Sequence, residues 1–204
     1  MIQLKGVNMP ILKSKFIYLI YMFLSKLPDI YMLNIWFNNI TKLRARVLNL
    51  LPNMKISNNV KIYTSVRISR NSNLILDENV SIKENCVIGG NIEVGENTQI
   101  LGHTKIDGSG KVIIGRDTHI GRENDIFSHY HDISKKNILV NKSKECFQET
   151  IIGNNVMLYS RVAIMGGVII EDNSAIAYGS IVTKNCEENI IYAGIPTKKI
   201  GERV

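Results

Sequence analysis

Hydrophobic residues recur every six positions along most of this chain. These anchor positions are filled by Ile, Leu or Val and fall into four blocks. They are Ile62 and Ile68; Leu76, Ile82, Ile88, Val94, Ile100 and Ile106; Ile114, Ile120 and Ile126; and Ile152, Leu158, Ile164, Ile170, Ile176 and Val182. A period of six is not helical, and because six is a multiple of two, all anchors can point to one side of a strand. The pattern predicts short strands that share an interior.

Each six-residue unit also carries a small residue and a turn residue. A small or β-branched residue, such as Cys86, Thr98 or Ser174, lies two positions before most anchors. The residue before it is often Asn or Asp, at Asn79, Asn85, Asn97, Asp117, Asn155 and Asn173. These residues tolerate the left-handed backbone of tight turns. The sequence therefore predicts a mainly β fold, a parallel β-helix of hexapeptide repeats. The alternative, a β-sandwich, would show irregular units of about 8–12 residues.

The six-residue phase breaks at three places. Slips of two residues lie at 72–76 and 107–111, and the largest break spans 127–150. A long irregular insertion inside a compact repeat is usually functional. We expect a β-helix over 56–204 with a protruding loop at 127–150 that carries the function.

The first 55 residues form a basic front end. They hold eight basic residues and one acidic residue, Asp29, which accounts for the whole net charge of +7. Helices are predicted over 11–27 and 29–51, broken at Pro28. The second has an apolar stripe with Lys42, Arg44 and Arg46 off its core. The stripe comprises Leu33, Trp36, Phe37, Ile40, Leu43, Val47, Leu50 and Leu51.

Two roles are open for residues 1–55. They can cap the open end of the β-helix, or they can also contact an anionic membrane surface. The uncharged apolar run 16–24 is too short for a transmembrane helix, which needs roughly 20 residues. The basic residues lack the aromatic interleaving of nucleic-acid modules, so no nucleic-acid partner is expected.

The three cysteines, Cys86, Cys146 and Cys186, are odd in number and widely spaced. This spacing indicates reduced thiols in a cytoplasmic protein rather than a disulfide framework or a zinc site. Because the basic front end can contact an anionic membrane, the expected location also includes the inner face of the cell membrane.

Two further segments carry a family resemblance. Residues 126–132 read IFSHYHD, and the C-terminal region contains IVTK at 181–184 and YAGIPTK at 192–198. With the ladder, these motifs resemble the left-handed β-helix acyltransferases, and more narrowly the O-acetyltransferases of sugars, capsules and surface polysaccharides. The resemblance covers about residues 56–204. It implies a left-handed parallel β-helix, a homotrimer with its active site between subunits, and acetyl transfer from acetyl-coenzyme A to a carbohydrate hydroxyl.

In that family a loop histidine is the general base, a role that suits imidazole because its pKa lies near working pH. His131 lies seventeen residues after Ile114, which is the spacing of the galactoside branch. It also ends the segment SHYH at 128–131, which resembles the Ser/Thr-Asp-x-His pattern of the capsule branch with His129 in place of Asp. His129 is the second candidate and a helper. The resemblance implies direct transfer with neither covalent intermediate nor metal. The alternative is that His129 and His131 are both solvated loop histidines without a catalytic role. The other two histidines, His103 and His119, are expected at the surface.

The resemblance also implies a binding site for acetyl-coenzyme A along the coils after the loop. Its residues would be Ser160, Tyr178, Gly179, Thr183, Lys184, Gly194, Pro196 and Lys198. Lys199 is expected to be a plain surface charge. Two positions depart from the family pattern: Met157 stands where the capsule branch often has tryptophan, and Thr197 replaces the usual alanine.

Three other functions remain open. One is an acetyltransferase of small molecules such as antibiotics, and another is a non-catalytic trimeric scaffold or binding module. The third is a γ-type carbonic anhydrase, which needs three histidines around zinc. His119, His129 and His131 lack a convincing arrangement for that site, so the carbohydrate O-acetyltransferase is the leading interpretation.

Overall fold

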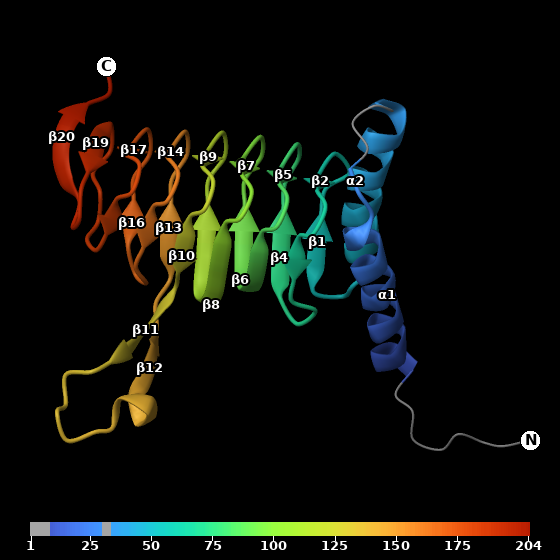
Figure 1. Cartoon of the computed structure of the whole chain (residues 1–204), viewed down its shortest axis with the longest axis horizontal. Helices are drawn as coiled ribbons and strands as arrows, with labels where there is room; N and C mark the ends of the chain where they lie inside the picture. The colour runs from blue at the N-terminus through green and yellow to red at the C-terminus, as the bar shows by residue number, and fades with distance from the viewer. Residues whose placement is uncertain (1–8, 30–33) are drawn as a thin grey trace, which may run out of the picture.

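The computed structural model describes residues 9–29 and 34–204. The predicted β-helix is confirmed as a β-solenoid of about seven turns, with two helices at its N-terminal end (Figure 1). They are α1 (Met9–Lys26) and α2 (Asn34–Leu48). Part of the predicted second helix, including Leu33, lies outside the described residues. The predicted domain boundary at 55–56 falls within the first strand and stays a prediction.

The solenoid has three faces, on which successive turns pair in parallel. Face 1 contains β1 (Met54–Ile56), β4 (Asn73–Leu76), the second halves of β6 (Val87–Val94) and β8 (Lys105–Ile114), β13 (Thr150–Ile152) and β16 (Ile169–Ile170). Face 2 contains β2 (Lys61–Ile62), β5 (Ser81–Ile82), β7 (Gln99–Ile100), β9 (His119–Ile120), β14 (Met157–Leu158), β17 (Ala175–Ile176), β19 (Ile190–Ala193) and the antiparallel β20 (Lys198–Glu202). Face 3 contains β3 (Arg67–Ile68), the first halves of β6 and β8, β10 (Asp125–Phe127), β15 (Ala163–Ile164) and β18 (Ile181–Val182).

The anchors stack in the interior. Ile82 pairs with Ile100 and Ile100 with Ile120, and all three are fully buried. The small positions before the anchors are buried as well, and several carry hydroxyls. Thr98 Oγ1 donates to the Gly115 carbonyl of the next turn at 2.7 Å and accepts from the Thr118 amide at 3.1 Å. These hydroxyls satisfy backbone groups that the corners leave buried.

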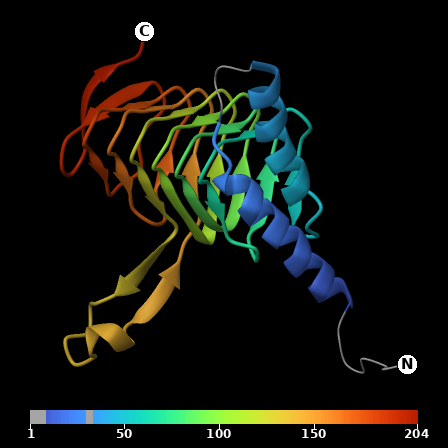
Figure 2. The same cartoon turned by 45° about the vertical axis from the view of Figure 1, so that its right-hand side comes forward.

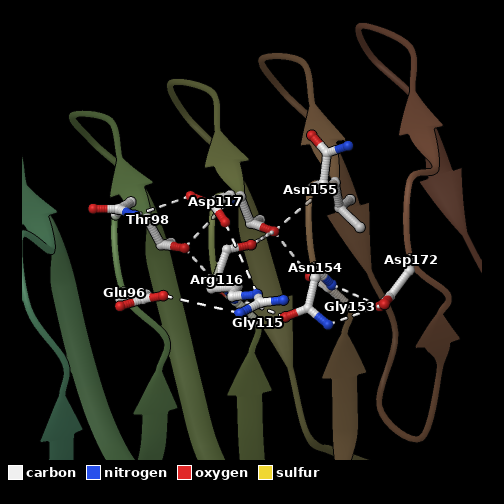
Figure 3. Close-up of polar contacts among 12 residues, drawn as sticks. Glu96, Thr98, Gly115, Arg116, Asp117, Gly153, Asn154, Asn155 and Asp172 are labelled. Atoms are coloured by element: carbon white, nitrogen blue, oxygen red, sulfur yellow. Dashed lines mark hydrogen bonds and ion pairs between the residues drawn. The ribbon is translucent and has the colours of Figure 1, made fainter.

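The predicted turn residues adopt left-handed backbone. The six Asn and Asp positions have φ between 52° and 61°, and their side chains stack between turns. Asn79 donates to Asn97 at 3.1 Å, and Asn97 donates to Asp117 at 3.0 Å. In the same region Asp172 accepts from the backbone and side-chain amides of Asn154, which lowers the pKa of its carboxyl (Figure 3). Polar ladders therefore join neighbouring turns from outside.

The irregular segments all lie at one corner, between face 3 and face 1, which we call the insertion corner. Its segments are 69–72, 89–91, 107–111, 127–149 and 165–168. The slip predicted at 107–111 and the large insertion fall here. The slip predicted at 72–76 lies mostly in β4, and the irregular residues of that turn are 69–72. The other two corners keep one length from Ile56 to Val182. The insertion forms a hairpin of β11 (His129–Asp132) and β12 (Lys144–Phe147), with the 3₁₀ turn η1 (Val140–Lys142) between them.

The helices cover the first turn of the solenoid. Tyr18 and Tyr21 of α1 donate their hydroxyls to the carbonyls of Ile68 and Val66, at 2.9 and 2.7 Å. Burial raises the pKa of the Tyr21 hydroxyl, which stays protonated and keeps this bond. α2 packs against β1 and β2. α1 therefore supplies hydrogen-bond donors to carbonyls at the open end of the repeat, and α2 covers the first strands.

The expected position of Arg44 outside the α2 core was wrong. Its side chain is fully buried and pairs with Asp29 at 2.6 Å. It also donates to the carbonyls of Leu24, Leu27 and Ile62. Asp29 supplies the buried countercharge, so the guanidinium ties α1, α2 and β2 together. The apolar stripe is rotated accordingly: Ile40 is buried, but Leu43 and Leu50 are exposed.

Removing Arg44 should destabilise the cap. Arg44→Met leaves Asp29 buried without its partner, and we expect a loss of about 3–5 kcal/mol in the free energy of unfolding. Arg46→Met, on the exposed side of the same helix, should change it by less than about 0.5 kcal/mol. Urea denaturation followed by circular dichroism measures both. Equal effects of the two variants would contradict the structural role of the ion pair.

The cysteines should differ in reactivity. Burial raises the pKa of Cys86 and of Cys186 to about 12, whereas Cys146 lies partly exposed on β12. Because the thiolate is the reactive form, we expect one fast-reacting thiol in native protein and three in denaturant. Titration with Ellman's reagent measures this, and Cys146→Ser should remove the fast phase. A fast phase that survives in Cys146→Ser would show that an interior cysteine is accessible.

Candidate active site

The hairpin that carries both candidate histidines projects from the insertion corner (Figures 1 and 2). His129 and His131 lie on β11, where they pair with Phe147 and Glu145 of β12. Residues two apart on a strand point to the same side. Their ring centroids are 6.2 Å apart, nearly perpendicular. The structure therefore brings the two predicted histidines together beside the end of β10 on face 3.

His129 lies against a carboxylate that the sequence analysis did not single out. Its Nδ1 is buried and lies 3.4 Å from Asp107 Oδ2, without a hydrogen-bond partner among the described residues. Asp107 is oriented by the Ser109 amide, which donates to its Oδ1 at 2.9 Å. In the tautomer with the proton on Nδ1, the Asp107 carboxylate is the nearest acceptor and the lone pair lies on Nε2.

His131 is held by its own hairpin and is more exposed, at 49 % of its side chain against 24 % for His129. Its Nδ1 lies 3.3 Å from Ser143 Oγ, which donates its hydrogen to the Val140 carbonyl at 2.7 Å. Because that hydroxyl is already donated, it can only accept from Nδ1–H, and in that tautomer the lone pair falls on Nε2, 3.9 Å from Glu145. Each histidine thus has an oxygen atom close to Nδ1.

Buried hydroxyls fix the base of the hairpin to the solenoid. Ser128 Oγ donates to the Asp107 carbonyl and accepts from the Gly110 amide, both at 2.8 Å. Thr150 Oγ1 donates to the Phe127 carbonyl at 2.6 Å. These bonds join the start of the insertion to the preceding turn and its two ends to each other, so β11 starts from a fixed position.

Gly166, on the next turn, lies directly against the start of β11. A Cβ there would lie 2.8 Å from the His129 backbone nitrogen and 3.0 Å from its oxygen. Only glycine leaves room for this approach. The sequence analysis placed Asp107 only in a phase slip and did not single out Gly166, because no local pattern shows which turn packs on the hairpin.

The predicted coenzyme-binding residues form two groups that flank the C-terminal part of face 3. The Gly179 amide donates to the Ser160 carbonyl, and Tyr178 lies exposed beside them. The Gly194 carbonyl, on the segment that follows, accepts from the Ile181 amide at the start of β18, and β18 leads to Thr183 and Lys184 on the other side of face 3. Pro196 follows a cis peptide bond, and Lys198 begins β20. All eight residues therefore lie on turns after the hairpin.

The lysines of this region differ in their partners. Lys199 pairs with Glu202 at 2.8 Å, which raises the pKa of its ammonium and occupies it. Lys184 and Lys198 are exposed and form no ion pair within the described residues. These two remain available to phosphate groups.

The three histidines of the carbonic anhydrase alternative are not gathered in one place. His119 lies on face 2, whereas His129 and His131 lie on the hairpin at the insertion corner. No group of three metal-binding side chains occurs within residues 9–29 and 34–204. His103 is a turn residue with φ of 65° and contacts Asn85.

Comparisons with known proteins agree with this architecture. The family model described as bacterial transferase hexapeptide (six repeats) matches residues 149–184. Over 51 residues the chain is 53 % identical to galactoside O-acetyltransferase of Escherichia coli (strain K12), a match that covers 25 % of each protein. The chain thus matches about a quarter of that relative's length.

Two solved structures share the fold over a larger part of the chain. A maltose O-acetyltransferase from Clostridium difficile 630 superposes with a TM-score of 0.59 and 20 % identity, covering 97 % of this chain and 90 % of that one. A hexapeptide-repeat acetyltransferase from Vibrio cholerae O1 biovar eltor, complexed with acetyl coenzyme A, gives 0.56 and 16 %, covering 78 % and 76 %. The chain therefore carries bacterial transferase hexapeptide repeats over 149–184, and it is similar to hexapeptide-repeat, left-handed β-helix acetyltransferases, among them the galactoside and maltose O-acetyltransferases.

Proposed function

We propose that the protein is an acetyl-coenzyme A-dependent O-acetyltransferase that acts on a hydroxyl of a sugar or surface-polysaccharide precursor. The observation that carries the proposal is the pair of histidines on β11, each with an oxygen within 3.4 Å of its Nδ1. The similarity to galactoside O-acetyltransferase supports the acetyl donor and the sugar acceptor.

His131 is the proposed general base. Its Nε2 takes the proton of the acceptor hydroxyl while that oxygen attacks the thioester carbonyl carbon. When the carbon–sulfur bond breaks, the His131 imidazolium returns the proton to the coenzyme sulfur. The products are an acetyl ester and a free thiol, so no covalent enzyme intermediate is needed. The raised pKa of Cys86 and of Cys186 supports this route, because neither buried thiol is a ready nucleophile.

Face 3 offers a surface for the acetyl donor. Its outward residues on β15 and β18 are Ala163 and Ile181, and Gly179 at the adjoining corner has open space where a Cβ would stand. Lys184 and Lys198 supply positive charge for the phosphates of the coenzyme. The coenzyme would thus run from the hairpin along the turns that follow it.

A homotrimer with the site between subunits belongs to the same proposal. Four isoleucines, Ile75, Ile113, Ile151 and Ile169, point outward from face 1 and form a row interrupted by Glu93. A flat apolar row on a solenoid face suits contact with another subunit. Such packing would bring a neighbour close to the insertion corner, which borders face 1.

Substitution of the two histidines tests the assignment. Thiol release from acetyl-coenzyme A should be measured with a panel of galactosides, maltose, lipid-linked sugars and macrolides as acceptors. We expect His131→Ala to lower kcat about 10²–10⁴-fold, because it removes the general base. His129→Ala should lower it less, and His103→Ala, a turn histidine on another corner, should leave it unchanged.

The outcomes separate the alternatives. Activity kept in His131→Ala but lost in His129→Ala would move the base to His129 and its Asp107 partner. Macrolide acetylation without sugar acetylation would favour a small-molecule acetyltransferase. An absence of thiol release with every acceptor, together with no coenzyme binding by calorimetry, would favour a non-catalytic scaffold.

The fit of Gly166 against β11 provides an independent test. Gly166→Ala should displace the start of the hairpin and lower kcat by about 10²-fold, the cost typical of a misplacement of about 1 Å. Gly89→Ala is the matched control, since a Cβ there meets nothing closer than 4.0 Å. Thermal unfolding separates a local displacement from general destabilisation. Equal kinetics in both variants would mean that the hairpin position is irrelevant to the reaction.

A further inference from the structure

Helix α1 has two apolar sides, and only one of them is needed for the fold. The inner side contains Ile17 and Tyr21, which are buried against the solenoid. The outer side carries a row of large hydrophobic side chains, which we call the outer stripe. It consists of Leu12, Phe16, Leu19, Ile20 and Phe23, which are between 38 % and 66 % exposed.

The outer stripe is continuous along the helix. Its members follow the spacing of one helical face, and at 3.6 residues per turn they span an arc of about 100°. α1 lies at the outer end of the molecule, beyond the first turn of the solenoid (Figures 1 and 2). The stripe is therefore a convex apolar ridge rather than part of the core.

Lysines border the outer stripe on both sides. At 100° per residue, Lys13 falls beyond one edge, and Lys15 and Lys26 fall beyond the other. All three are exposed, and α1 contains no acidic residue. Such an arrangement lets the apolar side chains enter an acyl layer while the ammonium groups reach the phosphates above it.

We propose that the outer stripe and its lysines form a docking surface for a bilayer that contains anionic lipids. The positive charge on both edges complements lipid phosphates, and a convex ridge suits a soft planar surface. A second copy of this helix is a poor occupant, because its lysines would face these lysines. Because its apolar side chains and lysines lie along one side of the helix, α1 would lie in the plane of the surface. Among the described residues, no helix qualifies as a membrane span.

Vesicle co-sedimentation of the full chain tests the proposal. The vesicles would be phosphatidylcholine with and without phosphatidylglycerol, at low and high NaCl. We expect binding to the anionic vesicles and a marked loss with salt, because screening weakens the lysine–phosphate attraction. Phe16→Ser/Phe23→Ser should weaken binding about tenfold or more. Lys15→Gln/Lys26→Gln should weaken it as well and reduce its salt dependence.

Phe147→Ser/Ile133→Ser is the matched control, since these residues are similarly exposed but lie on the insertion. It should bind vesicles as the unchanged protein does. Failure of the unchanged protein to bind anionic vesicles would overturn the proposal. So would a fall in molar mass by light scattering in Phe16→Ser/Phe23→Ser, since that result would identify the stripe as a contact between subunits. Vesicle binding is measured without substrates, so its outcome is independent of the proposed reaction.

Discussion

The vertical stacking of buried anchors is the constraint on which the rest of the structure depends. Each anchor lies on the anchor of the preceding turn, as Ile82, Ile100 and Ile120 do. An extra residue within a face would turn the next anchor outward and break the parallel pairing. Additional residues are therefore tolerated only at a corner. In this chain they gather at a single corner, and the candidate active site is built from them.

This constraint explains which parts of the fold the sequence could predict. The anchors, the small residues and the left-handed Asn positions repeat, so each unit supports the interpretation of the others. Arg44 does not repeat, and its burial depends on Asp29, which precedes α2 and lies outside it. Helical spacing alone assigns a charged residue to the solvent side. Only the tertiary arrangement reveals the countercharge that makes its burial tolerable.

The candidate site, too, could be predicted from the sequence only in part. The break in the repeat located the insertion, and the histidines in it were visible as a motif. Their partners come from different distances along the chain. Asp107 belongs to the preceding turn, and Gly166 belongs to the turn after the insertion. Such contacts are set by the stacking of turns, so a motif within one segment cannot reveal them. Once the solenoid register is known, however, both residues follow from their shared corner.

The distribution of charge and apolar surface separates catalysis from placement in the cell. Residues 56–204 are balanced in charge, and the histidines lie near carboxylates rather than in a basic field. The positive excess lies in the front end, where α1 needs only its inner side to cover the solenoid. Leaving five large hydrophobic side chains exposed brings no stability to the isolated chain, because their burial requires a partner surface. The hairpin and the N-terminal end of α1 extend from the same side of the solenoid (Figures 1 and 2). The outer stripe, however, faces away from the first turn, so a surface bound by α1 would lie across the N-terminal end of the solenoid and leave the hairpin histidines free of it.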